Sequence, residues 1–530
     1  MTPNGALPPR ATALLLGLVT ALLLFRLGQL PLIGPDEPRY ARVAVEMQRR
    51  DDWVIPTLQG RAWLEKPPLY SWMAGHAFAA LGENETAARL PSVVAAVAMT
   101  ALTALFGARL YGTAAGLHAG FIAGTGLLAF VYGRAASMDM LLAATVTAAV
   151  GLLALRMLGI AGGMATTGAG VCAGLALLAK GPLGVLLPVL VTVAFLALSR
   201  ERGQWWHRLA PGLLPAAVAV VVVAGPWYGA ILMAEGREFV DVFLLNHNLA
   251  RFTSTVHNHP GPIFYYVPIL LAGMFVWSGL IVPGLAALKP RAPADLFVLC
   301  WIAAPLAFFS AAGSKLPGYI LPCLPPLAIA MGRGADELIR AARPTWTSRA
   351  MGLVTVVLGA LVAASPLVAR AMHEPAWTLL VPPALWALVT ALALSRRIGG
   401  DPASALRILR VGAAGLLLLV TSAAVPVLAR RESGRALFRD TGGREVLAWN
   451  AWRTAWMAGY FYNDGRVREI ATLEEVTAAA TPGPALVLCG PAERRLLRAL
   501  PGYAVSVVAE GPREQTLLRV VRARTVVRPR

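Results

Sequence analysis

The chain has 530 residues, of which 57% are hydrophobic and 14% are charged. Its formal net charge is +19, but most of the arginines lie in short links between long apolar runs, which is typical of a membrane protein and argues against a nucleic-acid partner. The four cysteines have no CxxC spacing, so they indicate neither a zinc knuckle nor a disulfide framework.

The apolar runs predict membrane-spanning helices, because roughly 20 helical residues cross a hydrocarbon core of about 30 Å. The first run is interpreted as an uncleaved span, since Arg26 follows it and no small-residue cleavage site is near. Arg-rich links such as 199–208 and 395–410 are assigned to the cytoplasm. About thirteen spans are predicted, at 11–30, 87–109, 113–133, 140–159, 164–180, 182–199, 210–230, 263–285, 295–313, 317–332, 350–371, 376–395 and 409–429.

Residues 31–86 form a first outer loop that is too long to be a simple turn. We expect two short helices in it, 37–50 and 67–81, lying at the membrane interface. The first carries an apolar stripe at helical spacing. The stripe consists of Tyr40, Val43, Ala44 and Met47.

From residue 430 onward, short β-like runs alternate with helix-like stretches, which predicts a small α/β domain. An odd number of spans places this domain on the outer side of the membrane. The sequence therefore predicts an all-α polytopic membrane domain, 1–429, with outer interfacial helices, followed by a C-terminal α/β domain, 430–530.

Asp36 and Arg39 lie one helical turn apart, directly after the first span. An aspartate before Glu-Pro is a typical helix N-cap. The same arrangement can let an arginine bind an anionic phosphate while the carboxylate contacts an acceptor. Asp139, at the outer mouth of the fourth span, has the same two interpretations, and topology places it on the face that carries Asp36.

Lysines recur at predicted outer span ends, where the positive-inside rule disfavours them. Lys66 precedes two prolines, Lys180 ends the fifth span, and Lys315 stands four residues before Tyr319. Each can be a snorkelling anchor. Each can also be a fixed cation for a phosphate.

A second outer segment, 231–262, contains His247 and Arg251, which would share one face of a helix. His247 and Glu65 can form a hydrogen-bonded pair or two ligands of a divalent metal ion. Two ligands without a third are weak evidence for a metal.

Eight segments, in constant order from about residue 34 to 332, carry a resemblance to a known superfamily. They are PDEPRYARVAVEM, DWVIP, EKPPLYSW, SMD, AKGP, GPW, NHNLARF with HPGPIFYYVP, and SKLPGYILP. The chain resembles the aminoarabinose transferase and protein-mannosyltransferase-like superfamily of GT-C fold. The span count and the outer C-terminal domain look most like the branch that transfers aminoarabinose to lipid A.

The resemblance implies an undecaprenyl-phosphate-linked sugar as donor, inverting transfer without a nucleotide, and chemistry at the periplasmic face of a bacterial inner membrane. Lipid A or another envelope molecule would be the acceptor. It assigns a catalytic or acceptor-orienting role to Asp36 and Asp139, and donor-phosphate contacts to Arg39, Lys66, Lys315 and Tyr319. Substrate contacts fall on Tyr40, Lys180 and Arg251, and a metal pair on Glu65 and His247. Asn246 departs from the pattern, because the branch more often has an acid before the histidine.

Three other functions fit parts of the sequence. They are a protein O-mannosyltransferase-like enzyme or transfer to another envelope glycan, a polytopic transporter, and a non-catalytic scaffold. A transporter would place ionisable groups near the middle of the membrane. We expect instead that Asp36, Lys66, Asp139, His247 and Tyr319 gather around one external pocket.

Overall fold

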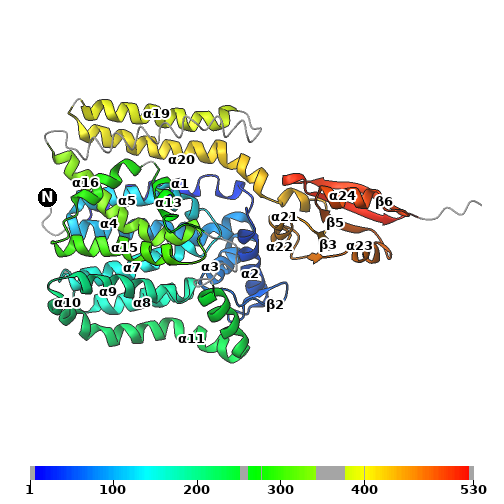
Figure 1. The fold of residues 1–530 in the computed structure, drawn as a ribbon, viewed down its shortest axis with the longest axis horizontal. Helices are drawn as coiled ribbons and strands as arrows, with labels where there is room; N and C mark the ends of the chain where they lie inside the picture. The colour runs from blue at the N-terminus through cyan, green and yellow to red at the C-terminus, as the bar shows by residue number, and fades with distance from the viewer. Residues whose placement is uncertain (1–5, 251–260, 276, 342–375, 399, 524–530) are drawn as a thin grey trace, which may run out of the picture. The chain divides into compact units, whose positions relative to one another are not determined.

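The structure is a computed structural model, and it describes residues 6–250, 261–275, 277–341, 376–398 and 400–523. The described chain is mostly helical and forms two compact units (Figure 1). Unit 1 comprises Met1–Phe25, Leu64–Tyr70 and Leu90–Ala423, and unit 2 comprises Arg26–Trp63, Ser71–Arg89 and Ala424–Arg530.

Unit 1 contains the long apolar helices, although residues 85–89 and 424–432, at the ends of two of them, belong to unit 2. In chain order these are α1 (Pro9–Leu24), α4 (Glu85–Tyr111), α5 (Thr113–Thr125), α6 (Leu127–Gly133), α7 (Asp139–Met157), α8 (Met164–Lys180), α9 (Leu183–Leu198), α10 (Arg202–Leu209) and α11 (Leu213–Phe239). They are followed by the π-helix η3 (Val240–Ala250), α13 (Tyr266–Gly273), α14 (Ile281–Ala287), α15 (Pro293–Ala311), the 3₁₀ helix η5 (Pro317–Cys323), α16 (Leu324–Arg340), α19 (Ala376–Ile398) and α20 (Pro402–Glu432).

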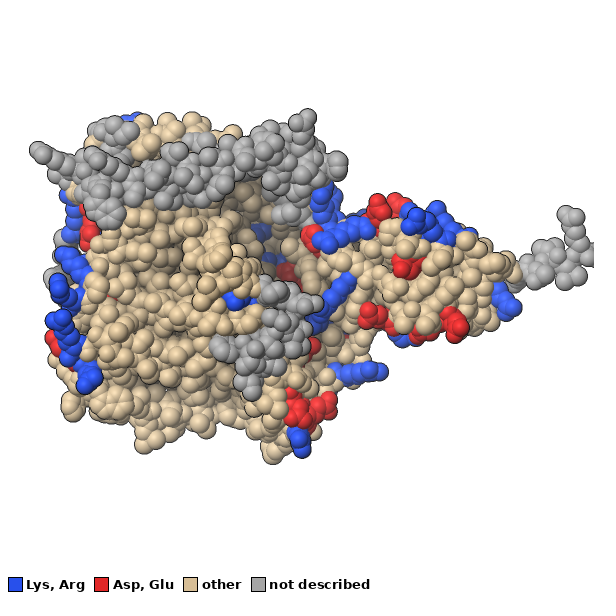
Figure 2. Space-filling model, in the orientation of Figure 1, with Lys and Arg blue, Asp and Glu red and all other residues tan. Residues whose placement is uncertain are grey.

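Within the described ranges, six helices are long and apolar enough to cross a membrane, or up to eight if each bent pair is one span. The chain is thus a multi-pass membrane protein. Figure 2 shows Lys and Arg gathered at the end of unit 1 that carries α10, while most of the face in view is free of charge. This is the surface expected of helices that lie in lipid and end in an aqueous layer.

Three predicted spans differ from the observed helices. The run 113–133 is bent by 58° between α5 and α6, where Gly126 is extended, and the run 263–285 is bent by 114°. The run 317–332 starts as η5, because Pro317 and Pro322 lack the N–H groups that a regular α-helix needs. The run 350–371 lies outside the described residues, so the count of thirteen spans stays a prediction.

A buried carboxylate ties three helices of unit 1 together. Asp295, in the first turn of α15, is ion-paired with Arg333 of α16 and accepts a hydrogen bond of 2.9 Å from the Tyr111 hydroxyl at the end of α4. Its second oxygen accepts from the Lys289 amide at 2.9 Å. A charge that is only 2% exposed is tolerated because it has these partners.

Unit 2 combines the first outer loop with the C-terminal part of the chain. The loop forms α2 (Asp36–Arg50), the hairpin β1 (Thr57–Leu58) with β2 (Arg61–Ala62), and α3 (Leu69–Leu81), whose first two residues belong to unit 1. The C-terminal part forms β3 (Val446–Trp449), α21 (Arg453–Met457), α22 (Gly459–Tyr462), β4 (Val467–Ile470), α23 (Leu473–Ala480), β5 (Ala485–Cys489), α24 (Pro491–Arg498), β6 (Tyr503–Glu510) and β7 (Thr516–Arg522).

The five C-terminal strands form one sheet in the order β4-β3-β5-β7-β6. Strand β3 is parallel to β4 and β5, whereas β7 is antiparallel to β5 and β6. Both faces of β3 and β5 are buried, one with α21 and α22 and the other with α23 and α24. The predicted small sheet with helices is therefore observed, whereas a separate domain at 430–530 and its location on the outer side stay predictions.

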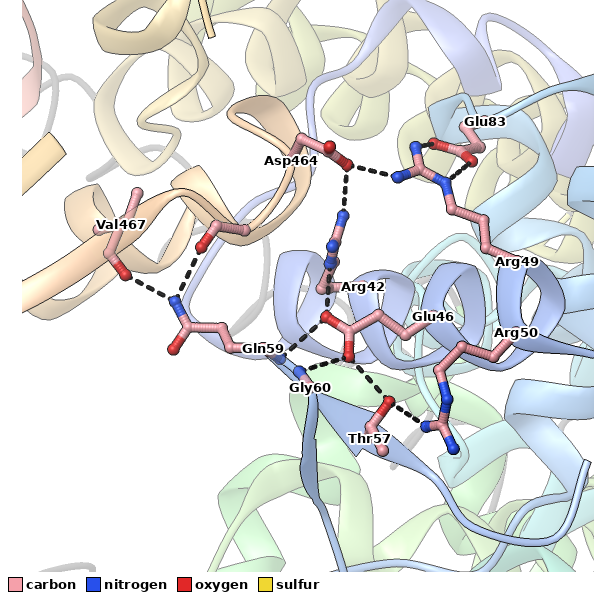
Figure 3. A network of polar contacts seen from close by, with 11 residues as sticks. Arg42, Glu46, Arg49, Arg50, Thr57, Gln59, Gly60, Glu83, Asp464 and Val467 are labelled. Carbon is pink, nitrogen blue, oxygen red and sulfur yellow. Dashed lines mark hydrogen bonds and ion pairs between the residues drawn. The ribbon is translucent and has the colours of Figure 1, made fainter. Parts of the chain in front are cut away.

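Helix α2 has the predicted apolar stripe: Val43, Ala44 and Met47 are fully buried and Tyr40 is 8% exposed. Glu46 is buried as well, although it lies off the stripe. It accepts hydrogen bonds from Thr57 Oγ1 at 2.8 Å and from the amides of Gln59 and Gly60 at 2.8 and 3.1 Å (Figure 3). The acid at this position therefore holds the β1–β2 turn on α2.

A chain of ion pairs continues from Glu46 to the C-terminal part of unit 2. Arg42 contacts Glu46 Oε1 at 2.7 Å and Asp464 Oδ1 at 2.6 Å, and Arg49 contacts Asp464 and Glu83, each at 2.7 Å (Figure 3). Burial alone would raise the pKa of Glu46, but the hydrogen bonds from Gly60, Arg42 and Thr57 and the charge of Arg42 hold that pKa below its ordinary value.

This network makes the stability of unit 2 sensitive to acid. A lowered native pKa means that the stabilisation is present above the unfolded pKa of about 4 and is lost as the pH falls through the native value. We expect Glu46→Gln to lower the local stability of the 57–60 turn by about 2 kcal/mol at pH 7, because charge-assisted hydrogen bonds are lost. Acidification to pH 3 should then destabilise the wild type more than the variant, as measured by hydrogen–deuterium exchange of the full chain.

Glu510→Gln is the matched control, because the Glu510 side chain is 72% exposed and its ion pair with Arg494 is long, at 3.8 Å. It should change the stability by less than about 0.5 kcal/mol. Equal exchange of the 57–60 turn in wild type and Glu46→Gln would show that the network does not hold it.

Candidate functional site

An ion pair joins the ends of two consecutive helices in unit 1. Asp139 is the first residue of α7 and Lys180 is the last residue of α8, and the two meet because the helices are antiparallel neighbours. Lys180 Nζ contacts Asp139 Oδ1, and the Lys180 side chain is 10% exposed. Gly181, at φ +83°, ends α8 directly after the lysine. Helix α8 thus ends at Lys180, the residue at which the sequence predicts the fifth span to end.

Ser137 completes the contacts of the Asp139 carboxylate. Its hydroxyl donates to Asp139 Oδ2 at 2.6 Å and accepts from the Asp139 amide at 3.1 Å. The helix residue before Asp139 is Met138, and no side chain caps this helix. The N-cap interpretation of Asp139 is therefore wrong, and its carboxylate instead points to side chains. Ser137 stands two residues before Asp139 in the SMD segment, and this spacing could have predicted the hydrogen bond between their side chains.

An aromatic residue from another part of the chain joins this pair. The Lys180 ammonium lies 4.6 Å from the centre of the Tyr319 ring, a cation–π distance. Tyr319 belongs to η5 and packs on Phe309, with ring centres 5.7 Å apart. Next to it, Gly318 allows close approach of the Tyr132 ring, since an added Cβ would lie 2.7 Å from that ring. Tyr132 was not predicted from the sequence.

Two further lysines of unit 1 are buried. Lys66 is 8% exposed and interacts electrostatically with Asp139. Lys315 is 7% exposed and its ammonium donates to the Ala312 carbonyl at 2.6 Å. The structure thus places Lys180 against both Asp139 and Tyr319, and Lys66 within electrostatic range of Asp139. A site that holds one carboxylate among several cations is suited to bind an anion.

Unit 2 carries another ion pair of candidate residues, Asp36 and Arg39. Arg39 Nη2 contacts Asp36 Oδ1 at 2.7 Å, and the Asp36 side chain is 55% exposed. The guanidinium of Arg39 lies 5.4 Å from the ring centre of Tyr40 and 5.8 Å from that of Trp63. The residue before α2 is Pro35, without a side-chain cap, so the capping interpretation of Asp36 is also wrong.

Glu37, rather than Asp36, fixes the start of α2. Its carboxylate accepts from the Ile33 amide at 2.7 Å and from Arg89 at 2.8 and 3.1 Å. Arg89 is 2% exposed and also donates to the carbonyls of Leu27, Leu30 and Pro31. This arginine therefore holds the segment that leads into Asp36. Sequence reasoning missed the pair because its members are 52 residues apart.

The remaining candidates are placed less completely. Arg251 lies outside the described residues, and His247 lies in η3. No group of three or more His, Cys, Asp or Glu side chains suited to a metal occurs within the ranges that the structure describes. The pairing of Glu65 with His247, and the gathering of Asp36 with the residues of unit 1 in one pocket, stay predictions.

Comparison with known proteins gives two further findings. Residues 65–228 match the family described as dolichyl-phosphate-mannose-protein mannosyltransferase. Proteins named undecaprenyl phosphate-alpha-4-amino-4-deoxy-L-arabinose arabinosyl transferase are similar over a longer stretch. The protein from Pseudomonas paraeruginosa is 33% identical over 360 residues, which are 65% of this chain and 62% of that protein, and the one from Enterobacter sp. is 32% identical over 66% and 63%.

The solved structures agree with the sequence relatives. The crystal structure of ArnT from Cupriavidus metallidurans bound to undecaprenyl phosphate covers 98% of this chain and 99% of its own, with a TM-score of 0.78 and 23% identity. This chain has the ArnT fold. The resemblance inferred from the eight segments is confirmed. An oligosaccharyltransferase from Archaeoglobus fulgidus shares the fold more distantly, with a TM-score of 0.52 and 11% identity over 88% of this chain and 64% of its own.

The ion pair of Asp139 and Lys180 joins the ends of α7 and α8, so we expect it to stabilise the packing of these helices. Removing one member leaves a buried charge without its partner, so we expect Lys180→Met to lower the free energy of unfolding by about 3 kcal/mol. The double variant Asp139→Asn with Lys180→Met should recover most of that loss, because both charges are then gone. Unfolding of the full chain by sodium dodecyl sulfate measures both values. Additive losses in the double variant would contradict a direct pair.

Proposed function

We propose that this chain is an inverting glycosyltransferase of a bacterial inner membrane. It moves a sugar from undecaprenyl phosphate to an acceptor at the periplasmic face. The sugar is 4-amino-4-deoxy-L-arabinose or a related one, and the acceptor is a phosphate of lipid A. The observation that carries the proposal is the full-length likeness to an ArnT structure that holds undecaprenyl phosphate. The chain spans less than two thirds of the length of these arabinosyl transferases.

The cations of unit 1 support binding of a lipid-linked phosphate. In the reaction, the bond between the anomeric carbon and the phosphate oxygen breaks, and undecaprenyl phosphate leaves with the electron pair. Negative charge grows on the leaving phosphate, so fixed cations stabilise the transition state more than the ground state. In unit 1 the candidates for these contacts are Lys66, Lys315 and the hydroxyl of Tyr319, and in unit 2 the candidate is Arg39. Lys180 keeps its place on Asp139 and orients Tyr319 through the ring contact.

Asp36 is the candidate for the acceptor side of the reaction. The acceptor oxygen forms the new bond to the anomeric carbon from the face opposite the leaving phosphate. A lipid A phosphate is already a nucleophile and needs little base, so an exposed carboxylate next to Arg39 orients the acceptor or stabilises positive charge at the anomeric carbon. With a hydroxyl acceptor, Asp36 would instead remove the proton as a general base.

A metal ion is not needed for these steps. Glu65 and His247 would supply two donors, fewer than the three or more protein ligands of most metal sites.

The positions of the charges favour transfer over transport. The pair of Asp139 and Lys180 lies at helix ends, and Asp295 lies in the first turn of its helix. Transporters instead place coupling groups near the bilayer midplane. The match of residues 65–228 to the protein-mannosyltransferase family supports a second candidate function, transfer to a protein hydroxyl.

The function is tested with the purified full-length chain in lipid nanodiscs. Undecaprenyl-phosphate-linked aminoarabinose and lipid A are supplied, and the products are analysed by mass spectrometry. We expect lipid A to gain the mass of one aminoarabinose residue per phosphate modified. Transfer to a serine- or threonine-containing peptide but not to lipid A would favour the second candidate, and no transfer to either would contradict both.

Asp36→Asn and Lys66→Ala should each lower kcat by roughly 10²-fold or more in this assay, because each removes a charge that acts on the reacting groups. Glu474→Gln is the control, since Glu474 is an exposed acid on α23. Wild-type rates in both Asp36→Asn and Lys66→Ala, with the proteins inserted normally, would remove these residues from the mechanism.

A further inference from the structure

Unit 2 contains a cavity that the candidate site does not use. Its volume is about 500 Å³, within the range of small-molecule sites. One wall comes from the β1–β2 hairpin and the others come from α21, α22 and β4. The side chains that matter for binding are Arg61, Arg466, Arg468, Glu469, Trp456 and Tyr460.

The charges on the walls suit a partly anionic ligand. Three arginines face two glutamates, Glu445 and Glu469, which leaves one positive charge in excess. Arg468 contacts Glu445 at 3.3 Å. Arg61 is exposed, and its side chain has no hydrogen bond or ion pair with any residue that the structure describes. Its guanidinium is therefore available for a ligand.

Hydrogen bonds of Gln59 hold one wall of the cavity in place. The Gln59 side chain donates to the carbonyls of Gly465 and Val467 at 2.8 and 2.6 Å (Figure 3). The Gln59 amide in turn donates to Glu46 of α2 at 2.8 Å. Hydrogen bonds thus fix one wall to the β4 side and to the helix that begins at Asp36. A preformed wall lowers the entropy that a ligand loses on binding.

Aromatic rings close the inner side. Trp456 and Tyr460 pack edge to face with ring centres 5.6 Å apart, and both are largely buried in the core of unit 2. Only part of each ring faces the cavity. This combination of aromatic surface, carboxylate and guanidinium groups can contact the apolar face, the hydroxyls and the phosphate of a sugar phosphate.

We propose that this cavity binds the phosphorylated sugar headgroup of the acceptor, an inference that rests on the proposed transfer to lipid A. Arg61 contacts the phosphate, with Arg466 and Arg468 at the rim, and Glu469 accepts from sugar hydroxyls. The cavity and Asp36 belong to the same compact unit. The C-terminal part of the chain therefore selects the acceptor, while the lysines of unit 1 serve the donor.

The inference is tested with Arg61→Ala in the full-length protein. We expect KM for lipid A to rise about tenfold, which is the effect of losing one charge-assisted contact worth about 1.4 kcal/mol. The value of kcat and the KM for the lipid-linked sugar should stay unchanged. Arg61→Lys should recover part of the affinity, because a lysine keeps the charge but not the planar geometry. Arg519→Ala, at an exposed arginine of β7 outside the cavity, should match the wild type.

Calorimetric titration with glucosamine 1-phosphate separates this inference from the proposed function. The compound has no acyl chains, so binding to the wild type and about tenfold weaker binding to Arg61→Ala would support headgroup recognition in the cavity. Normal transfer to lipid A with unchanged KM in Arg61→Ala would overturn the inference and leave the proposed function intact. Binding of the sugar phosphate through Arg61 without any transfer would contradict the proposed function and leave binding in the cavity intact.

Discussion

The ion pair between Asp139 and Lys180 joins the ends of α7 and α8, and both residues are candidates for the functional site of unit 1. Helices α7 and α8 are antiparallel, so the acid that starts one meets the base that ends the other. A charge at the edge of a membrane domain is tolerated only with such a partner. The same lysine lies against the Tyr319 ring, and Lys66 is within electrostatic range of Asp139. Residues from four separate parts of the chain therefore lie at or near this ion pair.

Unit 2 is also held together by buried ion pairs and charge-assisted hydrogen bonds. The buried pair of Glu37 and Arg89 fixes the start of α2, and Glu46 fixes its far end to the β1–β2 turn. Helix α2 is thus held at both ends, and Asp36 is carried by a helix that has little freedom to move. Asp464 extends this frame to the segment that precedes β4. Candidate acceptor residues and the cavity consequently share one rigid frame within unit 2.

The sequence predicted those features that depend on local pattern. Helix 37–50 was predicted from the helical spacing of its apolar residues, and helix 67–81 from an apolar run too short for a span. Four of the five C-terminal strands were predicted from short β-like runs. Strand β4 was missed, since Arg468 and Glu469 interrupt the pattern. The roles of Glu37 and Glu46 depend on partners in other segments, Arg89 for the first and the 57–60 turn for the second. Spacing within one segment cannot show such contacts, which is also why the helix-capping interpretations of Asp36 and Asp139 were wrong.

The central claim is that the basic residues around Asp139 bind the phosphate of the lipid carrier. An electron cryomicroscopy structure of the full-length chain with undecaprenyl phosphate tests it directly. We expect the phosphate within about 3 Å of Lys66 or the Tyr319 hydroxyl, with Lys180 still on Asp139. A phosphate bound at the opposite ends of these helices, out of reach of both residues, would contradict the account.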